Sequence, residues 1–186
     1  MFSLDYSVFN AIYGFATSVS YLEWVYVFLA NYFPYIIAIV FLYELLHVKD
    51  LKKKFYIFFL TIVSVLFSWG IIAYSFHFFF YRARPFIALG AVSGTSTPAV
   101  VSLIHAAASP SFPSGHIAFL TPIVLAAFLI NKRTGIWLSV LTIFVGIGRV
   151  AVGVHWPSDI LGGMLSGVIS YFAIYLLFSK TTKLKA

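Results

Sequence analysis

The stretch that decides the fold is FYIFFLTIVSVLFSWGIIAYSFHFFF, residues 55–80. It contains no Asp, Glu, Lys or Arg, and its large apolar side chains would cover every face of a helix. A helix needs about 20 apolar residues to cross the hydrocarbon core of a bilayer, and a helix that is apolar all round is typical of a lipid environment. These residues therefore predict a transmembrane helix.

The rest of the chain repeats this pattern. Of 186 residues, 62% are hydrophobic and 9% are charged, whereas soluble domains carry about 25% charged residues. Five segments are apolar and long enough to be predicted as spans: 22–46, 55–80, 113–130, 135–154 and 158–178. The chain has no cysteine, which excludes disulfides and thiol nucleophiles. We expect one all-α domain over residues 1–186, an integral membrane helical bundle.

Residues 1–21 have a different pattern. Apolar side chains recur every three to four residues, at Leu4, Val8, Ile12, Phe15 and Val19. Polar residues such as Asp5 interrupt them, and this spacing is typical of an amphipathic helix. We expect this helix to lie in the membrane interface or to be re-entrant, with a sixth full span as the alternative.

The net charge of +7 suggests a nucleic-acid partner until the basic residues are placed along the chain. Nine of the twelve lie between or after spans: Lys49, Lys52, Lys53, Lys54, Lys132, Arg133, Lys180, Lys183 and Lys185. With five alternating spans all nine fall on one side, and the positive-inside rule makes that side cytoplasmic. We therefore expect the bilayer as partner and no nucleic acid, and no obligate protein partner is evident.

The remaining cations fall on the opposite side with other ionisable groups. Arg82, Arg84 and Arg149 are there, as are Asp159, the predicted outer loop 81–112 and four of the five histidines: His77, His105, His116 and His155. Ionisable side chains near membrane helices are costly unless they are paired or hydrated, so their gathering indicates a functional site.

Three short motifs organise this site: HFFFYRARP at 77–85, SFPSGH at 111–116 and GRVAVGVHWPSD at 148–159. In the second, Ser114 and Gly115 offer a hydroxyl and open backbone N–H groups at a helix N-terminus, which suits a phosphate. In the third, Asp159 follows His155 by four residues and can orient its ring as a nucleophile or base. Arg149 can donate a planar fork to phosphate oxygens.

Together the three motifs resemble the signatures of the type 2 phosphatidic acid phosphatase (PAP2) superfamily. This resemblance implies a membrane phosphatase without metal or other cofactor, in which His155 attacks phosphorus to form a phosphohistidine. Asp159 would orient His155, and His116 would protonate the leaving oxygen. The phosphate-binding groups would be Arg84, Arg149, Ser114 and Gly115.

Two positions depart from the family pattern. His77 stands where the family usually has lysine, and Gly148 stands where a serine usually precedes the arginine. A histidine donates to phosphate through one N–H or when protonated, so a binding role for His77 is in doubt, and Arg82 is a candidate to replace the missing charge. Gly148 lacks the hydroxyl but leaves room for close helix packing.

The chain looks most like the bacterial undecaprenyl-diphosphatase branch, which implies a multi-pass protein of the bacterial inner membrane with an extracytoplasmic active site. Its substrate would be a lipid phosphate, namely undecaprenyl diphosphate. Phosphatidylglycerol phosphate, lipid A phosphates and phosphatidic acid remain alternatives, as does phosphotransfer to a lipid. A transporter or scramblase is the non-enzymatic alternative, and a zinc site on the histidines is a weaker one.

Small residues on the last two predicted spans are interpreted as helix contacts, not ligand sites. They are Gly146, Gly148, Gly153, Gly162, Gly163, Ser166 and Gly167. The four tryptophans are interpreted as interfacial or packing residues.

Overall fold

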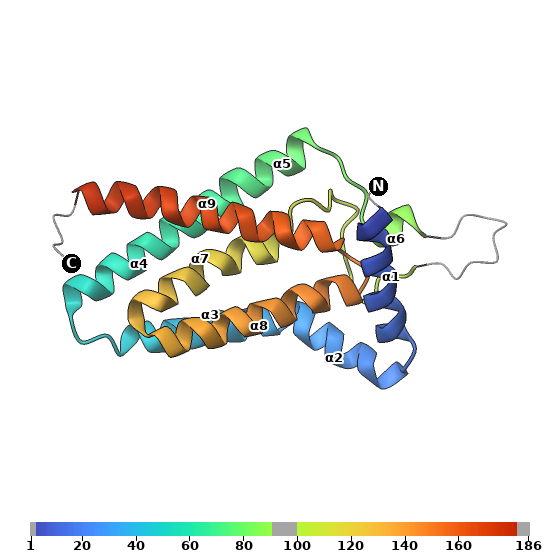
Figure 1. Cartoon of the computed structure of the whole chain (residues 1–186), viewed down its shortest axis with the longest axis horizontal. Coiled ribbons are helices and arrows are strands. Elements are labelled where there is room, and N and C mark those ends of the chain that lie inside the picture. Colours follow the sequence, from blue (N-terminus) through green and yellow to red (C-terminus); the bar gives the residue numbers. More distant parts are fainter. Residues whose placement is uncertain (1–2, 91–99, 182–186) are drawn as a thin grey trace.

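The computed structural model describes residues 3–90 and 100–181 of the chain. Its elements, in order, are α1 (Ser3–Thr17), α2 (Ser20–Asn31), α3 (Phe33–Leu46), α4 (Leu51–Val65), the π-helix η1 (Leu66–Ala73), α5 (Tyr74–Phe79), α6 (Pro85–Ala88), α7 (Gly115–Ile130), α8 (Lys132–Ala151) and α9 (Pro157–Thr181). The described part contains no strand. The long helices form a bundle, and α1 lies across one end of it (Figure 1). The predicted all-α class is confirmed.

Three helices are long and apolar enough to cross a membrane: Leu51–Phe79, Lys132–Ala151 and Pro157–Ser179. The first joins α4, η1 and α5, and it begins four residues before the predicted start because the Asp50 carboxylate accepts from the N–H groups of Lys52 and Lys53. α7 has 16 residues and is shorter than the usual span. The membrane bundle is therefore established, and the count of five spans stays a prediction.

The predicted span over residues 22–46 forms two helices, α2 and α3, which together are long and apolar enough for one broken span and are bent by 45° relative to each other. Pro34, in the first turn of α3, has no N–H, so the carbonyl of Ala30 loses the partner that a continuous helix would supply. Arg149 Nη1 lies 3.5 Å from that carbonyl oxygen and donates to it. The bend thus leaves the Ala30 carbonyl free to accept a hydrogen bond from Arg149, a predicted site residue.

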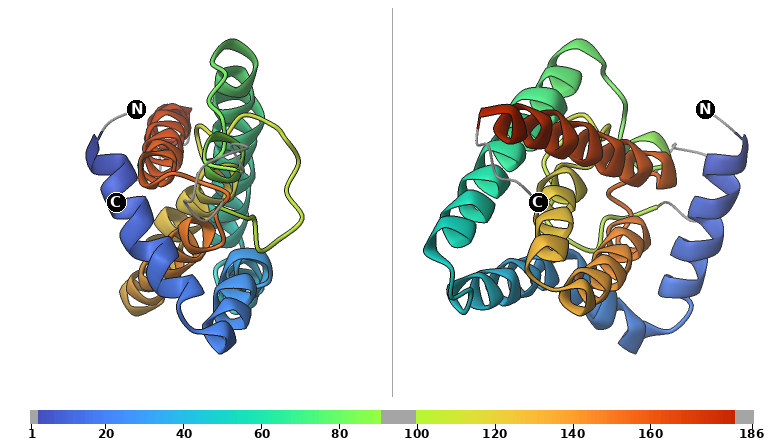
Figure 2. Two further views of the ribbon diagram at one scale, coloured as in Figure 1. Left: turned by 90° about the vertical axis from the view of Figure 1, so that its right-hand side faces the viewer. Right: turned by 60° about the vertical axis from the view of Figure 1, so that its left-hand side comes forward.

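α7 occupies the centre of the bundle, in contact with α3, α4, η1, α8 and α9 (Figure 2). Pro122 inside α7 leaves the carbonyl of Ala118 without its helical donor. The Ser68 hydroxyl, from η1, donates to that carbonyl at 2.8 Å. A buried side chain of the neighbouring helix therefore replaces the missing backbone hydrogen bond.

Glycines let α9 and α8 approach their neighbours. A Cβ at Gly163 would stand 2.6 Å from the Ser114 carbonyl oxygen, and one at Gly148 would stand 2.9 Å from the Cβ of Leu29. Similar contacts occur at Gly146, Gly162 and Gly167. The interpretation of these residues as packing positions is confirmed. Gly153 has φ +81° and ends α8 with a turn that L side chains rarely adopt.

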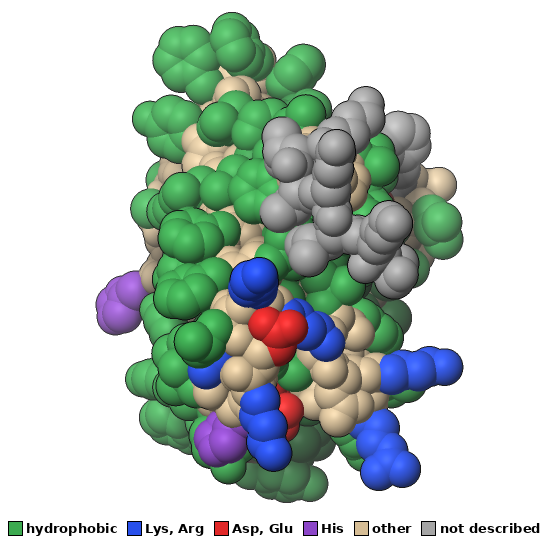
Figure 3. Space-filling model, turned by 90° about the vertical axis from the view of Figure 1, so that its left-hand side faces the viewer, with side chains coloured by type: hydrophobic (Ala, Val, Ile, Leu, Met, Phe, Trp, Pro, Cys, Tyr) green, Lys and Arg blue, Asp and Glu red, His purple; other side chains and the backbone are tan. Residues whose placement is uncertain are grey.

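The two ends of the bundle differ in charge. Figure 3 shows the end of the bundle away from α1. Lys and Arg side chains gather on one part of this face, and hydrophobic side chains cover much of the rest. The α3–α4 and α7–α8 connections carry the first two predicted basic clusters to this end. Lys183 and Lys185 of the third cluster lie outside the described residues, as do residues 91–99 of the predicted outer loop.

The buried face of α1 is not the one that the predicted apolar series would give. Asp5, Phe9 and Ala16 are buried, whereas Leu4 and Phe15 of the predicted apolar series are largely exposed. The polar Asp5 therefore faces protein, whereas Leu4, Val8 and Phe15 of the apolar series face outward and Ile12 packs against the core.

Candidate active site

The three motifs meet at the end of the bundle where α6, α7, α8 and α9 begin or end, the end that faces the viewer in the left view of Figure 2. Backbone hydrogen bonds connect them. The Ser111 N–H donates to the Arg82 carbonyl at 2.9 Å, and the Ser114 N–H donates to the Asp159 carbonyl at 2.9 Å. Sequence motifs that lie far apart are thereby fixed in one cluster.

Arg84 is buried in this cluster, with 8% of its surface exposed. It precedes Pro85, which restricts it to the extended conformation observed, and so places it just before α6. Its Nε donates to the Ser109 carbonyl and its Nη1 to the Val154 carbonyl, both at 3.0 Å. Burial lowers the pKa of Arg84, and the charge of Asp159 opposes that shift. The guanidinium is thus held in place by backbone acceptors.

His155 lies between α8 and α9, and its hydrogen bonds define its tautomer. Its Nδ1 lies 3.0 Å from the Ser111 carbonyl oxygen, which can only accept, so Nδ1 carries the proton. Nε2 then holds the lone pair in the neutral ring, and Nη1 of Arg84 lies 3.5 Å from it. Burial lowers the pKa of His155 to about 4, so the ring is neutral at pH 7. Nε2 is therefore the ring nitrogen that carries the lone pair.

Asp159 sits in the first turn of α9, after Pro157, the first residue of that helix. Its Oδ2 accepts from the backbone N–H of Trp156 at 2.8 Å, the reciprocal half of a capping box. The same oxygen lies 3.5 Å from Nδ1 of His155. The carboxylate faces the ring as expected, but Ser111 supplies the closer partner, which the sequence did not indicate.

The predicted phosphate cradle lies at the start of α7. Ser114 is buried at the N-cap, yet its hydroxyl has no hydrogen-bond partner and does not cap the helix. A Cβ on Gly115 would stand 3.3 Å from Nε1 of Trp69, so this opening turn is narrow. His116 follows within electrostatic reach of Arg149 and His155. The predicted cradle residues and the predicted general acid therefore share the first turn of α7, and His116 lies within electrostatic reach of His155.

Arg149 is the remaining predicted phosphate-binding residue. It lies in the last turn of α8, and 6% of its surface is exposed. Its Nε has no partner, and the Ser111 hydroxyl is likewise buried without one. Buried polar atoms are almost always hydrogen-bonded in folded proteins. Ser111, Ser114 and Arg149, from the second and third motifs, thus each carry an unpaired buried donor, which is the chemistry that an acceptor-rich ligand requires.

His77 and Arg82, the two further candidates for phosphate binding, form hydrogen bonds with other residues of the protein. Nε2 of His77 is 3.0 Å from the Pro113 carbonyl oxygen, so this histidine holds the turn that leads into Ser114. Arg82 donates from Nη1 to Asp159 at 2.6 Å and from Nη2 to Asp5. Neither side chain is arranged as a phosphate donor. His105 is exposed and has no part in the cluster.

The charges of the cluster favour an anion. Its described cations are Arg82, Arg84 and Arg149, and its carboxylates are Asp5 and Asp159. Arg82 contacts both carboxylates, so in the described part of the chain the buried guanidinium groups of Arg84 and Arg149 form no ion pair, and the cluster has one cation in excess. Among residues 3–90 and 100–181 no three His, Cys, Asp or Glu side chains gather as metal ligands.

Comparison with known proteins agrees with this geometry. Residues 58–183 match the model of the PAP2 superfamily. The chain is 28% identical over 172 residues to the undecaprenyl-diphosphatase BcrC of Bacillus subtilis (strain 168), covering 92% of this chain and 83% of that protein.

Two crystal structures share the fold. LpxE of Aquifex aeolicus superposes with a TM-score of 0.71 at 20% identity, covering 94% of this chain and 96% of that one. A PAP2-type phosphatidylglycerolphosphate phosphatase of Bacillus subtilis superposes with a TM-score of 0.66 at 21% identity, covering 99% and 90%. Because the match to the family model spans more than half of the residues of this chain, the chain belongs to the PAP2 superfamily.

Proposed function

We propose that this protein hydrolyses the terminal phosphate of a lipid diphosphate, with undecaprenyl diphosphate as substrate and undecaprenyl phosphate as product. The observation that carries the proposal is the pair of buried arginines, Arg84 and Arg149, beside an unprotonated His155 Nε2. Cations and unpaired donors stabilise the oxygens of a phosphoryl group as it is transferred.

In the first half-reaction the lone pair of His155 Nε2 attacks phosphorus, and the bond between phosphorus and the leaving oxygen breaks. His116 gives its proton to that oxygen, and the positive charge gained by the His155 ring is balanced by Asp159. The proton on Nδ1 stays in its hydrogen bond with the Ser111 carbonyl. Arg84, Arg149, Ser114 and the Gly115 N–H hold the three non-bridging oxygens.

In the second half-reaction a water molecule attacks phosphorus, and His116 takes a proton from it. The bond from phosphorus to Nε2 breaks, inorganic phosphate leaves, and His155 returns to its neutral tautomer. No step requires a metal, because the arginines supply the positive charge that a metal would otherwise supply.

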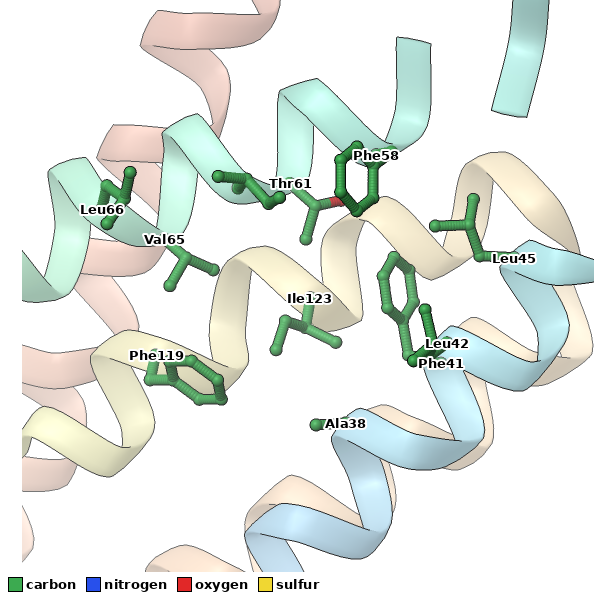
Figure 4. Close-up of a pocket in the computed structure, with 11 residues that line it drawn as sticks. Ala38, Phe41, Leu42, Leu45, Phe58, Thr61, Val65, Leu66, Phe119 and Ile123 are labelled. Atoms are coloured by element: carbon green, nitrogen blue, oxygen red, sulfur yellow. The ribbon is translucent and has the colours of Figure 1, made fainter. Parts of the chain in front are cut away.

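Two largely apolar hollows support a lipid substrate. Next to Gly115, the residues Trp69, Gly70, Ala73, Tyr74 and His77 line a groove of about 420 Å³. Further along α4 a second pocket of about 250 Å³ opens between α3, α4 and α7, where Phe41, Phe58 and Ile123 are among the lining residues (Figure 4). Residues of the Leu51–Phe79 helix line both hollows, and most of the lining side chains are apolar, as a hydrocarbon chain would require.

The proposed arrangement in the membrane has five crossings: α2 with α3, then α4 to α5, then α7, α8 and α9. α1 lies in the outer interface, and residues 81–112 connect α5 to α7 on that side. The basic connections then face the cytoplasm and the site faces outward. This matches an enzyme of the bacterial inner membrane that acts on the outer face.

The test is phosphate release by purified protein from undecaprenyl diphosphate, phosphatidylglycerol phosphate, phosphatidic acid and lipid A, with and without a chelator. We expect undecaprenyl diphosphate to give the highest kcat/KM and the chelator to have no effect. His155→Ala should lose activity, whereas His105→Ala, an exposed histidine outside the cluster, should keep it.

A different preferred lipid would contradict the substrate, and activity in His155→Ala would contradict the nucleophile. Phosphatidylglycerol phosphate is the second candidate, since a phosphatase for that lipid shares the fold. A phosphorylated lipid or sugar acceptor in place of free phosphate would instead indicate a phosphotransferase.

A further inference from the structure

One face of α1 contacts residues from distant parts of the chain at three successive turns. Asp5 contacts Ser158 and Arg82, and the ring of Phe9 packs on Trp156 with centroids 5.1 Å apart. One turn further, the Tyr13 hydroxyl donates to the Val101 carbonyl and accepts from the Val101 N–H, both at 3.0 Å. This helix therefore packs against residues next to Asp159 and His155.

Asp5 makes the polar contacts on this face. Its Oδ1 accepts from the Ser158 N–H at 2.9 Å, and its Oδ2 accepts from the Ser158 hydroxyl at 2.8 Å and from Nη2 of Arg82. Only 6% of its surface is exposed. A carboxylate is rarely buried unless it is paired, so this position indicates a specific role.

Arg82 divides its charge between two carboxylates. Nη1 donates to Oδ1 of Asp159 at 2.6 Å while Nη2 faces Asp5, and the guanidinium carbon lies 5.6 Å from the centre of the Trp156 ring. Without Asp5 the positive charge of Arg82 would act on Asp159 alone. The negative field of Asp159 at His155, 3.5 Å away on its other oxygen, would then be weakened.

We propose that Asp5 is a positioning residue for the phosphatase reaction. It balances the charge of Arg82, so that Arg82 offsets less of the negative field of Asp159 at His155, and it accepts hydrogen bonds from Ser158 in the first turn of α9, next to Asp159. The inference rests on the proposed function, because the charge matters when the His155 ring becomes positive during attack on phosphorus. Neither Asp5 nor Arg82 contacts the phosphate in this reaction.

The experiment measures kcat and KM for Asp5→Asn, which can still accept from the Ser158 N–H but has no charge. We expect kcat to fall about tenfold, the effect of one displaced charge on a buried reacting group, with KM within about twofold of wild type. Asp5→Glu restores the charge and should recover most of kcat. Asp50→Asn is the matched control, because that carboxylate caps α4 at the opposite end of the bundle.

A double-mutant cycle separates charge balance from helix capping. When Arg82→Gln has already removed the cation, adding Asp5→Asn should change kcat by less than about twofold, since there is no longer a charge to balance. A merely structural role predicts the same loss in both backgrounds. Thermal unfolding in detergent checks that each variant is folded.

Two results would overturn this inference. One is an Asp5→Asn enzyme with wild-type kcat, and the other is an equal loss of kcat in the Arg82→Gln background. The proposed function fails in a different way, through a wild-type protein and an Asp50→Asn protein that release no phosphate from any lipid. The two failures are therefore distinguishable.

Discussion

Replacing Ser114 by alanine should raise stability and lower activity together. The Ser114 hydroxyl is buried and has no partner in the ligand-free fold. An unsatisfied buried polar group costs about 1–3 kcal/mol, so its removal should stabilise the protein by about 1 kcal/mol after the lost packing is subtracted. For a chain of this size that raises the unfolding midpoint by about 2–4 °C.

The same hydroxyl is placed to donate to a charged phosphoryl oxygen. Hydrogen bonds to charged groups contribute about 1.5–3 kcal/mol, so Ser114→Ala should lower kcat/KM by about 10- to 150-fold. The assays are thermal unfolding in detergent, with and without vanadate as an analogue of the transferring phosphoryl group, and phosphate release from the lipid diphosphate. Vanadate should protect the wild type more than the variant.

Two other buried serines are matched controls. Ser64 is also buried without a partner but lies on α4 away from the cluster, so Ser64→Ala should gain similar stability and keep wild-type kcat/KM. Ser68 donates to the Ala118 carbonyl, so Ser68→Ala should lose about 1–3 kcal/mol. The reasoning is refuted if Ser114→Ala loses stability as Ser68→Ala does, or if it turns over substrate like the wild type.

Three further predictions concern the packing, the groove and the nucleophile. Gly148→Ser places a Cβ 2.9 Å from that of Leu29 and should cost about 1–3 kcal/mol in thermal unfolding, whereas Gly14→Ser, with nothing within 4 Å, should be neutral. Gly70→Leu has open space and fills the groove, so it should raise KM for a long-chain diphosphate and leave KM for a short, water-soluble one unchanged. Burial lowers the pKa of His155 from 6.5 to about 4, so the unfolded chain binds that proton more readily between these values. Stability should therefore be full above pH 6.5 and decline as the pH falls towards 4, and His155→Asn should flatten the decline of the unfolding midpoint; an unchanged slope would contradict the assignment.

Hydropathy and motif spacing determined much of this protein without a structure. Long apolar runs such as 55–80 can be stable only where lipid replaces water, so the helical membrane bundle follows from composition and segment length. The three motifs determined which residues gather, because Arg84-Pro85, the Ser114–His116 turn and the His155–Asp159 pair have local geometries that suit phosphate and a histidine nucleophile.

Contacts between distant segments were decided only by the tertiary structure. The Ala30 carbonyl reaches Arg149 because Pro34 freed it and Gly148 let α2 approach, and no local pattern encodes that meeting. The amphipathic pattern of residues 1–21 placed Asp5 among the polar residues of that helix, yet Asp5 is buried against Arg82 and Ser158. The physical reason is that hydropathy reports which residues tolerate lipid, whereas a buried charge is placed by its partner, and that partner lies 77 residues away in the chain.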